Sequence, residues 1–115
     1  TGTIRKNPDI LWNKNEKDIE RLANTQIKLL DKAVSKLNYK GILIYCNCSM
    51  QFEEGEKVID FFIKKNRVKL LPIKPEELKL FPTEIFKSGF IRTLPHMYNE
   101  LGGLDGFFIA RFIKA

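Results

Sequence analysis

The sequence has few of the residues that build disulfide frameworks and metal sites. Its 115 residues include two cysteines and one histidine. Cys46 and Cys48 are separated by a single residue, so they cannot form the long-range disulfide framework of small secreted domains. One Cys-x-Cys pair without further cysteine or histidine nearby has too few ligands for zinc. We therefore expect a reduced, cytoplasmic protein without a metal.

Long apolar runs are also missing. No stretch approaches the about 18 consecutive apolar residues of a membrane-spanning helix. The segment Thr1–Lys6 has no signal-peptide pattern, and the sequence does not begin with methionine. We expect no membrane association, and we expect the chain to be a piece of a longer protein.

Composition favours one globular domain with a modest core, since 43% of the residues are hydrophobic. The formal net charge is +6. Nine basic and five acidic residues fall in residues 1–40, against eleven and nine in residues 41–115. This charge suits a polyanion such as RNA, but lysine outnumbers arginine 15 to 5, and a lysine excess also arises from composition alone.

Hydrophobic periodicity indicates an alternation of helices and strands. Asn15 followed by Asp18 resembles a helix cap, and apolar residues then recur at steps of three and four as far as Leu37. Gly41 can take the left-handed conformation of a helix stop. We expect a helix over 15–37, a strand over 41–46, a helix over 53–65, an edge strand over 68–73, a long loop over 74–104 and a strand over 106–114.

This order predicts the second half of an α/β domain with a mixed sheet. The continuous apolar run 41–46 is typical of a strand that is buried on both faces. Only three strands are expected, which leaves a strand edge exposed. Non-native association of two chains through that edge is one consequence of such a truncation.

The triplet Asn47-Cys48-Ser49 follows the strand 41–46. In open α/β sheets, ligands and chemistry gather just beyond the carboxyl ends of strands. Cys48 is therefore a candidate nucleophile, although a strand-end cysteine can also be a buried residue without chemical importance. We interpret Cys46 as a core residue.

Several segments, taken together and in order, resemble the Sun (Fmu) family of RNA cytosine methyltransferases, and within it the branch of bacterial small-subunit rRNA methyltransferase B. The likeness runs from the first residue to the last and is weakest between residues 66 and 90. It is carried by Thr1-Gly-Thr-Ile-Arg-Lys-Asn-Pro-Asp-Ile-Leu-Trp12, Leu22-Ala23, Gln26, Leu29-Leu-Asp31, Gly41-Ile-Leu-Ile-Tyr-Cys-Asn-Cys-Ser49, Glu53-Glu54, Arg92-Thr-Leu-Pro-His96 and Asp105-Gly-Phe-Phe108.

The resemblance implies a Rossmann-like methyltransferase sheet with an antiparallel last strand. It also implies transfer of a methyl group from S-adenosylmethionine to carbon 5 of a cytosine in RNA, for this branch in small-subunit rRNA. The family nucleophile is a cysteine that activates the ring by adding to carbon 6, and Cys48 falls on it. A second family cysteine, which supports product release, belongs to an Asp-Ala-Pro-Cys-Ser motif upstream of Gly2.

The resemblance further implies that residues 1–115 are the carboxyl-terminal part of one catalytic domain. The cofactor-binding residues of the family lie in the upstream half, and none is expected here. We expect the chain alone to be inactive. The sequence departs from the family at Asn47, Phe52 and Gly55, where threonine, proline and asparagine are usual.

Other residues receive more modest interpretations. Arg5 and Lys6 lie where the family carries basic residues near the RNA, so they are candidate RNA-binding residues. We interpret His96 as structural and Trp12 as a staple of the entry loop onto the first helix. Glu54, with the preceding glutamate, is expected to favour a helix start through the helix dipole.

Two further hypotheses remain open. A non-catalytic RNA-binding or assembly module on the same fold would bind RNA tightly and in a salt-sensitive manner. A thiol-redox protein would use Cys46 and Cys48 as low-pKa thiols that cycle through a disulfide.

Overall fold

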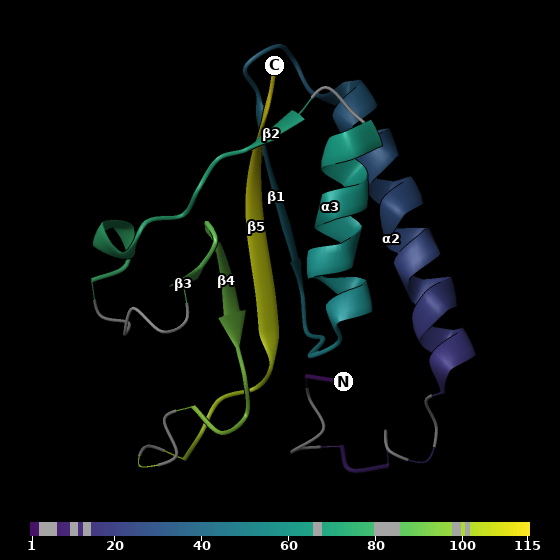
Figure 1. Cartoon of the computed structure of the whole chain (residues 1–115), viewed down its shortest axis with the longest axis vertical. Coiled ribbons are helices and arrows are strands. Elements are labelled where there is room, and N and C mark those ends of the chain that lie inside the picture. Colours follow the sequence, from purple (N-terminus) through teal and green to yellow (C-terminus); the bar gives the residue numbers. More distant parts are fainter. Residues whose placement is uncertain are drawn as a thin grey trace.

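A computed structural model of the chain describes residues 1–2, 7–9, 12, 15–65, 68–79, 86–97, 100 and 102–115 (Figure 1). Within these ranges, a helix long and apolar enough to cross a membrane is not found. The elements are α2 (Glu16–Lys36), β1 (Ile42–Asn47), η1 (Phe52–Glu54), α3 (Glu56–Lys65), β2 (Val68–Leu70), η2 (Pro75–Glu77), β3 (Phe86–Lys87), β4 (Phe90–Thr93) and β5 (Phe107–Lys114).

Helix α2 begins and ends as its sequence requires. The Asn15 side chain accepts a hydrogen bond from the Asp18 amide (3.0 Å), and the Asp18 carboxylate accepts one from the Asn15 amide (3.2 Å), which completes a capping box. At the other end, the Lys114 ammonium donates to two carbonyl groups of the last turn. The predicted helix is confirmed.

The turn after α2 differs from the prediction at one residue. Lys40, and not Gly41, has the positive φ, of 63°. Gly41 is required for a different reason, because a Cβ atom there would lie 2.7 Å from the Asn38 carbonyl oxygen. The glycine therefore lets two backbone segments approach closely.

Strand β5 is the centre of the described sheet. It pairs antiparallel with β1 along one edge, and with β2 and β4 along the other. The expectation of an antiparallel last strand is confirmed. Strand β2 has a described partner on one side only, as Pro72 suggested.

Three strands were expected, and the described residues form five, because β3 and β4 make a hairpin inside the predicted loop 74–104. Its two-residue turn uses positive φ angles at Ser88 (52°) and Gly89 (92°), the geometry that suits the twist of paired strands. Strands this short show no sustained periodicity, which is why the sequence pattern missed them.

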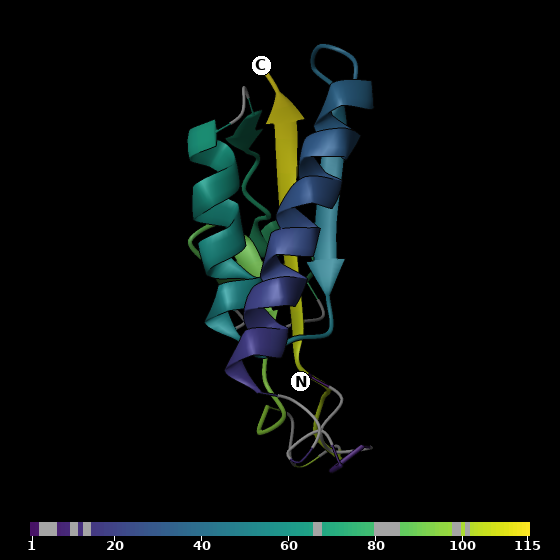
Figure 2. The ribbon, with the colours of Figure 1, turned by 90° about the vertical axis from the view of Figure 1, so that its right-hand side faces the viewer.

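Helices α2 and α3 lie side by side on one face of the sheet (Figures 1 and 2). The main core fills the space between these helices and β5. Its buried side chains are Leu30, Val34, Tyr45, Val58, Ile59, Phe62, Val68, Phe108, Ala110 and Phe112. On the opposite face, a smaller cluster forms around Ile91 and Met97.

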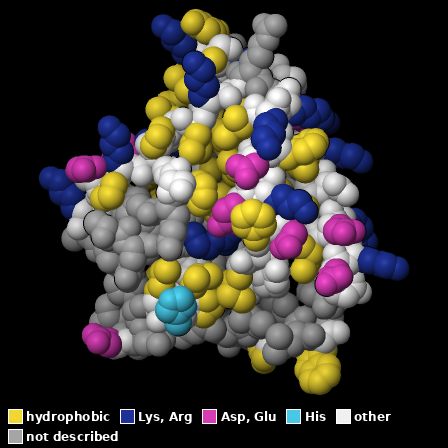
Figure 3. Space-filling model, in the orientation of Figure 1, with side chains coloured by type: hydrophobic (Ala, Val, Ile, Leu, Met, Phe, Trp, Pro, Cys, Tyr) yellow, Lys and Arg dark blue, Asp and Glu magenta, His cyan; other side chains and the backbone are white. Residues whose placement is uncertain are grey.

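The expectation that β1 is buried on both faces is wrong for the described chain. Ile42 and Ile44 point away from the helices and are 56% and 61% exposed. No described strand pairs with the outer edge of β1. The space-filling view (Figure 3) shows hydrophobic side chains between charged ones on the side of the molecule nearest the viewer. An apolar strand with one bare face and one free edge has the residues of an interior strand without its neighbours.

We expect the core between the two helices and the sheet to contribute most of the free energy of unfolding. Phe112 is fully buried and packs edge-on against Phe62, with ring centroids 5.3 Å apart. We expect Phe112→Ala to lower the free energy of unfolding of the chain by about 3–5 kcal/mol. Phe61→Ala is the matched control, because Phe61 is 50% exposed, and should cost about 1 kcal/mol or less. Urea denaturation followed by circular dichroism measures both, and equal losses would contradict this core.

Candidate active site

Cys48 lies immediately beyond the carboxyl end of β1, at the place that the sequence indicated. Its thiol is free and exposed. Cys46 is also free and exposed, so the interpretation of Cys46 as a core residue is wrong. The reason is that Cys46 shares the uncovered face of β1 with Ile42 and Ile44.

The turn through Cys48 is closed on its amino side by Asn47. The Asn47 side-chain oxygen accepts a hydrogen bond from the Ser49 amide (3.1 Å), which folds the backbone around Cys48. The Asn47 amide group donates to the Glu54 carbonyl (2.7 Å) and to the Tyr45 hydroxyl (2.9 Å). Asn47 thus ties the end of β1 to η1.

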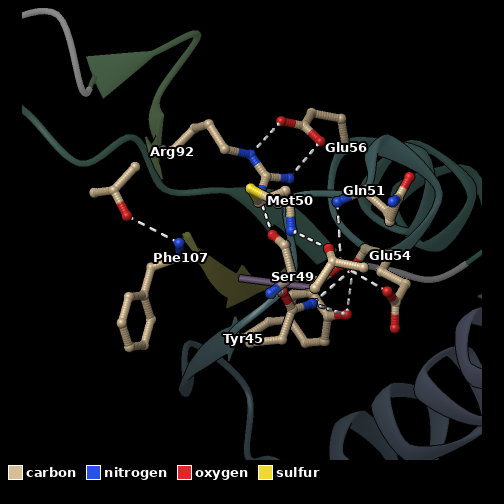
Figure 4. Close-up of polar contacts among 11 residues, drawn as sticks. Tyr45, Ser49, Met50, Gln51, Glu54, Glu56, Arg92 and Phe107 are labelled. Carbon is tan, nitrogen blue, oxygen red and sulfur yellow. Dashed lines mark hydrogen bonds and ion pairs between the residues drawn. The ribbon is translucent and has the colours of Figure 1, made fainter. Parts of the chain in front are cut away.

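On the carboxyl side of Cys48, Ser49 is buried and fully engaged. Its hydroxyl donates to Glu54 Oε2 (2.6 Å) and accepts from the Gln51 amide (3.1 Å) (Figure 4). Glu54 Oε1 accepts a hydrogen bond from Gln26 of α2 (3.3 Å). Glu54 therefore does more than favour a helix start, because it links α2 to the cysteine turn.

Arg92 of β4 holds the same turn from the sheet side. Its guanidinium donates to the Ser49 carbonyl and forms two hydrogen bonds with Glu56, at 3.0 and 2.7 Å (Figure 4). It also stacks on the Phe108 ring, with Cζ 4.7 Å from the centroid. A planar, forked cation is suited to such simultaneous contacts.

The first residues of the chain form a third support. The Gly2 amide donates to the Cys48 carbonyl (2.7 Å), and the Gly106 amide donates to the Gly2 carbonyl (2.8 Å). Gly2 thereby bridges the end of β1 and the start of β5. A Cβ atom on Gly2 would lie 2.0 Å from the Gly106 carbonyl oxygen, so only glycine fits.

Burial in this site changes the ionisation of Tyr45. Its hydroxyl donates to the Glu54 carbonyl (2.7 Å), and burial raises the pKa of the phenol to about 12. The neutral phenol is therefore a stable donor over the physiological range. Tyr45 belongs to the support of the turn and not to the proton-transferring groups.

The other residues singled out from the sequence lie apart from this turn or outside the described ranges. Arg5 and Lys6 lie outside the described residues. His96 is exposed in the turn after β4, and Trp12 is 89% exposed, so the predicted staple onto α2 is wrong. Phe107 and Phe108 are neighbours in β5. Phe107 is half-exposed and Phe108 is buried, because successive strand residues face opposite sides of the sheet.

Metal-binding groups and ligand-sized hollows are the other possible sites in the described part of the chain. Within the described ranges, no group of three or more His, Cys, Asp or Glu side chains is placed to hold a metal ion. Two hollows of about 300 and 340 Å³ lie along α2 and α3, and Cys48 lines neither of them. Their lining includes Glu20, Ala23, Ile27, Glu53, Lys57 and Phe61.

Sequence reasoning found the thiol but missed how it is held. From the sequence, Glu54 has only its place in the family likeness and an expected effect on a helix start. Arg92 has only its place in the family likeness, and Tyr45 only its place in an apolar strand. The one available signal was a charged side chain next to an apolar run, which does not reveal burial. Arg92 bonds to Glu56 and Ser49, which are 36 and 43 residues away, and Glu54 bonds to Gln26, which is 28 residues away. Ser49, Asn47 and Tyr45 lie only 5 to 9 residues from Glu54, but these bonds depend on the fold of the turn, which no hydrophobic period reveals.

Tyr45 gives a prediction on the pH dependence of stability. The phenol of the unfolded chain ionises near its ordinary value of 10.0, whereas the folded one keeps its proton to about 12. The unfolded state therefore loses the proton first, and this group should make the free energy of unfolding fall as the pH rises from 10 to 12. A phenolate absorbance titration, with Tyr45→Phe as reference, checks it. A Tyr45 midpoint near 10 in the folded chain would contradict a buried donor.

Comparison with known proteins gives the family. The model of the family described as 16S rRNA methyltransferase RsmB/F matches residues 1–113. A 28S rRNA (cytosine-C(5))-methyltransferase of Mus musculus is 38% identical over 122 residues, which cover 99% of this chain and 15% of that protein. A ribosomal RNA small subunit methyltransferase B of Yersinia pseudotuberculosis is 32% identical over 114 residues, which cover 99% of this chain and 24% of that protein.

A solved structure gives the same result. NSun6 from Pyrococcus horikoshii, crystallised with the S-adenosylmethionine analogue SFG, aligns with a TM-score of 0.66 and 30% identity over 88% of this chain and 24% of its own. The likeness confirms the predicted Rossmann-like α/β class. The chain thus spans between 15% and 24% of the length of these proteins. It belongs to the RsmB/F (Sun or Fmu) family of rRNA methyltransferases.

Proposed function

We propose that the full-length protein methylates carbon 5 of a cytosine in ribosomal RNA, with Cys48 as the nucleophile. The observation that carries this proposal is an exposed free thiol at the carboxyl end of a strand, on a turn that is held at both flanks. The relatives are named for 28S and for small-subunit rRNA. Ribosomal RNA is therefore the proposed substrate, and the small subunit stays a prediction from sequence.

The chemistry requires a thiolate at this place. Carbon 5 of cytosine is a weak nucleophile. When the Cys48 sulfur forms a bond to carbon 6, the electron pair of the 5,6 double bond moves to carbon 5. Carbon 5 would then take the methyl group from S-adenosylmethionine, with S-adenosylhomocysteine as the leaving group. A base would remove the proton from carbon 5, and the electron pair left behind would re-form the 5,6 double bond and expel the Cys48 thiolate. S-adenosylmethionine supplies the methyl group in this family. The base must leave its stack to reach the thiol.

We also propose that residues 1–115 are the carboxyl-terminal part of one catalytic domain. The bare face of Ile42 and Ile44 and the free edge of β1 support an upstream half that packs there. The hydrogen bond from the Gly2 amide to the Cys48 carbonyl also supports this division of the domain, because it brings any residues that precede Thr1 next to the proposed nucleophile. The family's second cysteine and the cofactor-binding residues would lie in that upstream half.

RNA binding and location complete the proposal. Arg5 and Lys6 are proposed to contact the RNA, and the net charge of +6 supports a polyanionic partner. A cytoplasmic location is proposed for the full-length protein.

Removal of the thiol tests the assignment of the nucleophile. In the full-length protein, Cys48→Ala should lower methyl transfer from labelled S-adenosylmethionine to rRNA transcripts by at least about a thousandfold, because the proposed bond from sulfur to carbon 6 can no longer form. Cys46→Ala is the matched control and should stay near wild type. Methyl transfer that survives Cys48→Ala would contradict the role of Cys48 and favour a non-catalytic RNA-binding role for this part of the chain.

The proposed division of the domain predicts that the isolated chain lacks the cofactor site. Isothermal titration of the chain with S-adenosylmethionine should give a Kd weaker than roughly 1 mM, whereas the full-length protein should bind at least about a hundredfold more tightly. The chain should also show no turnover. Tight binding by the chain alone would place the cofactor residues within 1–115 and overturn the division.

A further inference from the structure

Glu54 stands out among the supports of the cysteine turn because its carboxylate is buried. The residue is 5% exposed and lies in η1, directly beneath the turn. A buried carboxylate costs free energy unless its oxygens are satisfied. An apolar side chain could terminate η1 without this cost, so the presence of a buried carboxyl group at this position requires an explanation.

The partners of Glu54 are hydrogen-bond donors and not a cation. Oε2 accepts from the Ser49 hydroxyl (2.6 Å), and Oε1 accepts from Gln26 (3.3 Å). The nearby guanidinium of Arg92 is engaged with Glu56 instead. Within the described part of the chain, no ion pair to Glu54 is found. The carboxylate is therefore used as a double acceptor.

Glu54 also holds the other side of the turn. Its backbone carbonyl accepts from Asn47 (2.7 Å), so the residues before and after Cys48 are both bonded to one residue. Figure 4 shows these contacts converging on Glu54 from β1 and from the turn. Gln26 in turn fixes the carboxylate from α2.

We propose that Glu54 is a positioning residue that sets where the Cys48 sulfur stands relative to the bound cytosine. The proposal rests on the proposed function. Addition to carbon 6 needs the sulfur about 3–3.5 Å from that carbon and along the correct direction, and a displacement of about 1 Å can cost about a hundredfold in rate. A turn bonded at both flanks to one buried residue meets this requirement.

The test uses the full-length protein with Glu54→Gln, which keeps the size of the side chain but turns one acceptor into a donor. We expect kcat for methylation of rRNA transcripts to fall about tenfold to a hundredfold, with KM for the transcript within about twofold of wild type. Glu53→Gln is the matched control. It makes the same charge change one residue away, where no contact to the turn is found among the described residues, and it should leave both constants unchanged.

A second pair of variants separates positioning from folding. Ser49→Ala removes the hydroxyl that Glu54 holds and should lower kcat like Glu54→Gln, whereas Ser49→Thr keeps a hydroxyl and should restore most of the rate. The double variant Glu54→Gln/Ser49→Ala should be no slower than the slower single one, because both remove the same contact. If Glu54→Gln does not fold, the Ser49 pair decides.

Alkylation by iodoacetamide supplies the remaining readout. The measurement is made in a Cys46→Ser background, so that Cys48 is the thiol followed. Because this small reagent needs no fixed orientation of the sulfur, Glu54→Gln should change the rate of Cys48 alkylation by no more than about twofold. Wild-type kcat in Glu54→Gln and in Ser49→Ala, or an equal loss of alkylation and kcat, would overturn the inference. If instead the unsubstituted protein methylates no rRNA, or Cys48→Ala keeps full activity, the proposed function itself fails.

Discussion

The cysteine turn depends on one residue, Glu54, which binds it through both its backbone and its side chain. Its backbone carbonyl accepts hydrogen bonds from the side chains of Asn47 and Tyr45. Its carboxylate accepts hydrogen bonds from the side chains of Ser49 and Gln26. These contacts join α2, β1 and η1 into one polar unit beside the hydrophobic core. Apart from the Gln26 side-chain oxygen, which is buried without a hydrogen-bond partner among the described residues, these contacts satisfy one another, and such a buried network is rigid. The strand end that carries the thiol is therefore fixed although the thiol itself is exposed.

The sheet adds a second constraint that acts on the same turn. Arg92 joins the Ser49 carbonyl to Glu56 and lies on the Phe108 ring. Because Phe108 is part of the central strand β5, the turn is tied to the most buried layer of the molecule. The opposite side of β1 has no such support within the described chain, where Ile42 and Ile44 stand bare. The site is thus rigid from the helical side and open on the side where the upstream half of the domain is proposed to pack.

Sequence patterns predicted the features that local chemistry determines. The capping box of α2, the apolar strand β1, the last strand β5 and the placement of Cys48 all follow from neighbouring residues. The β3–β4 hairpin escaped because two-residue and four-residue strands show no period. The exposure of Cys46 and Ile44 could not be predicted either, since burial depends on what covers the sheet. Arg92 acts through Ser49 and Glu56, which are distant from it in sequence. Glu54 acts through Ser49, Asn47 and Gln26, which only the folded turn and α2 bring to it.

The central claim is that the Cys48 sulfur forms a covalent bond to the target cytosine. The most direct measurement is peptide mapping by mass spectrometry of the full-length protein after reaction with S-adenosylmethionine and rRNA transcripts that contain 5-fluorocytidine. Fluorine cannot leave carbon 5 as the proton does, so the bond to sulfur should persist. The account predicts a nucleotide adduct on the peptide that contains Cys48. An adduct on another residue, with Cys48 unmodified, would contradict it.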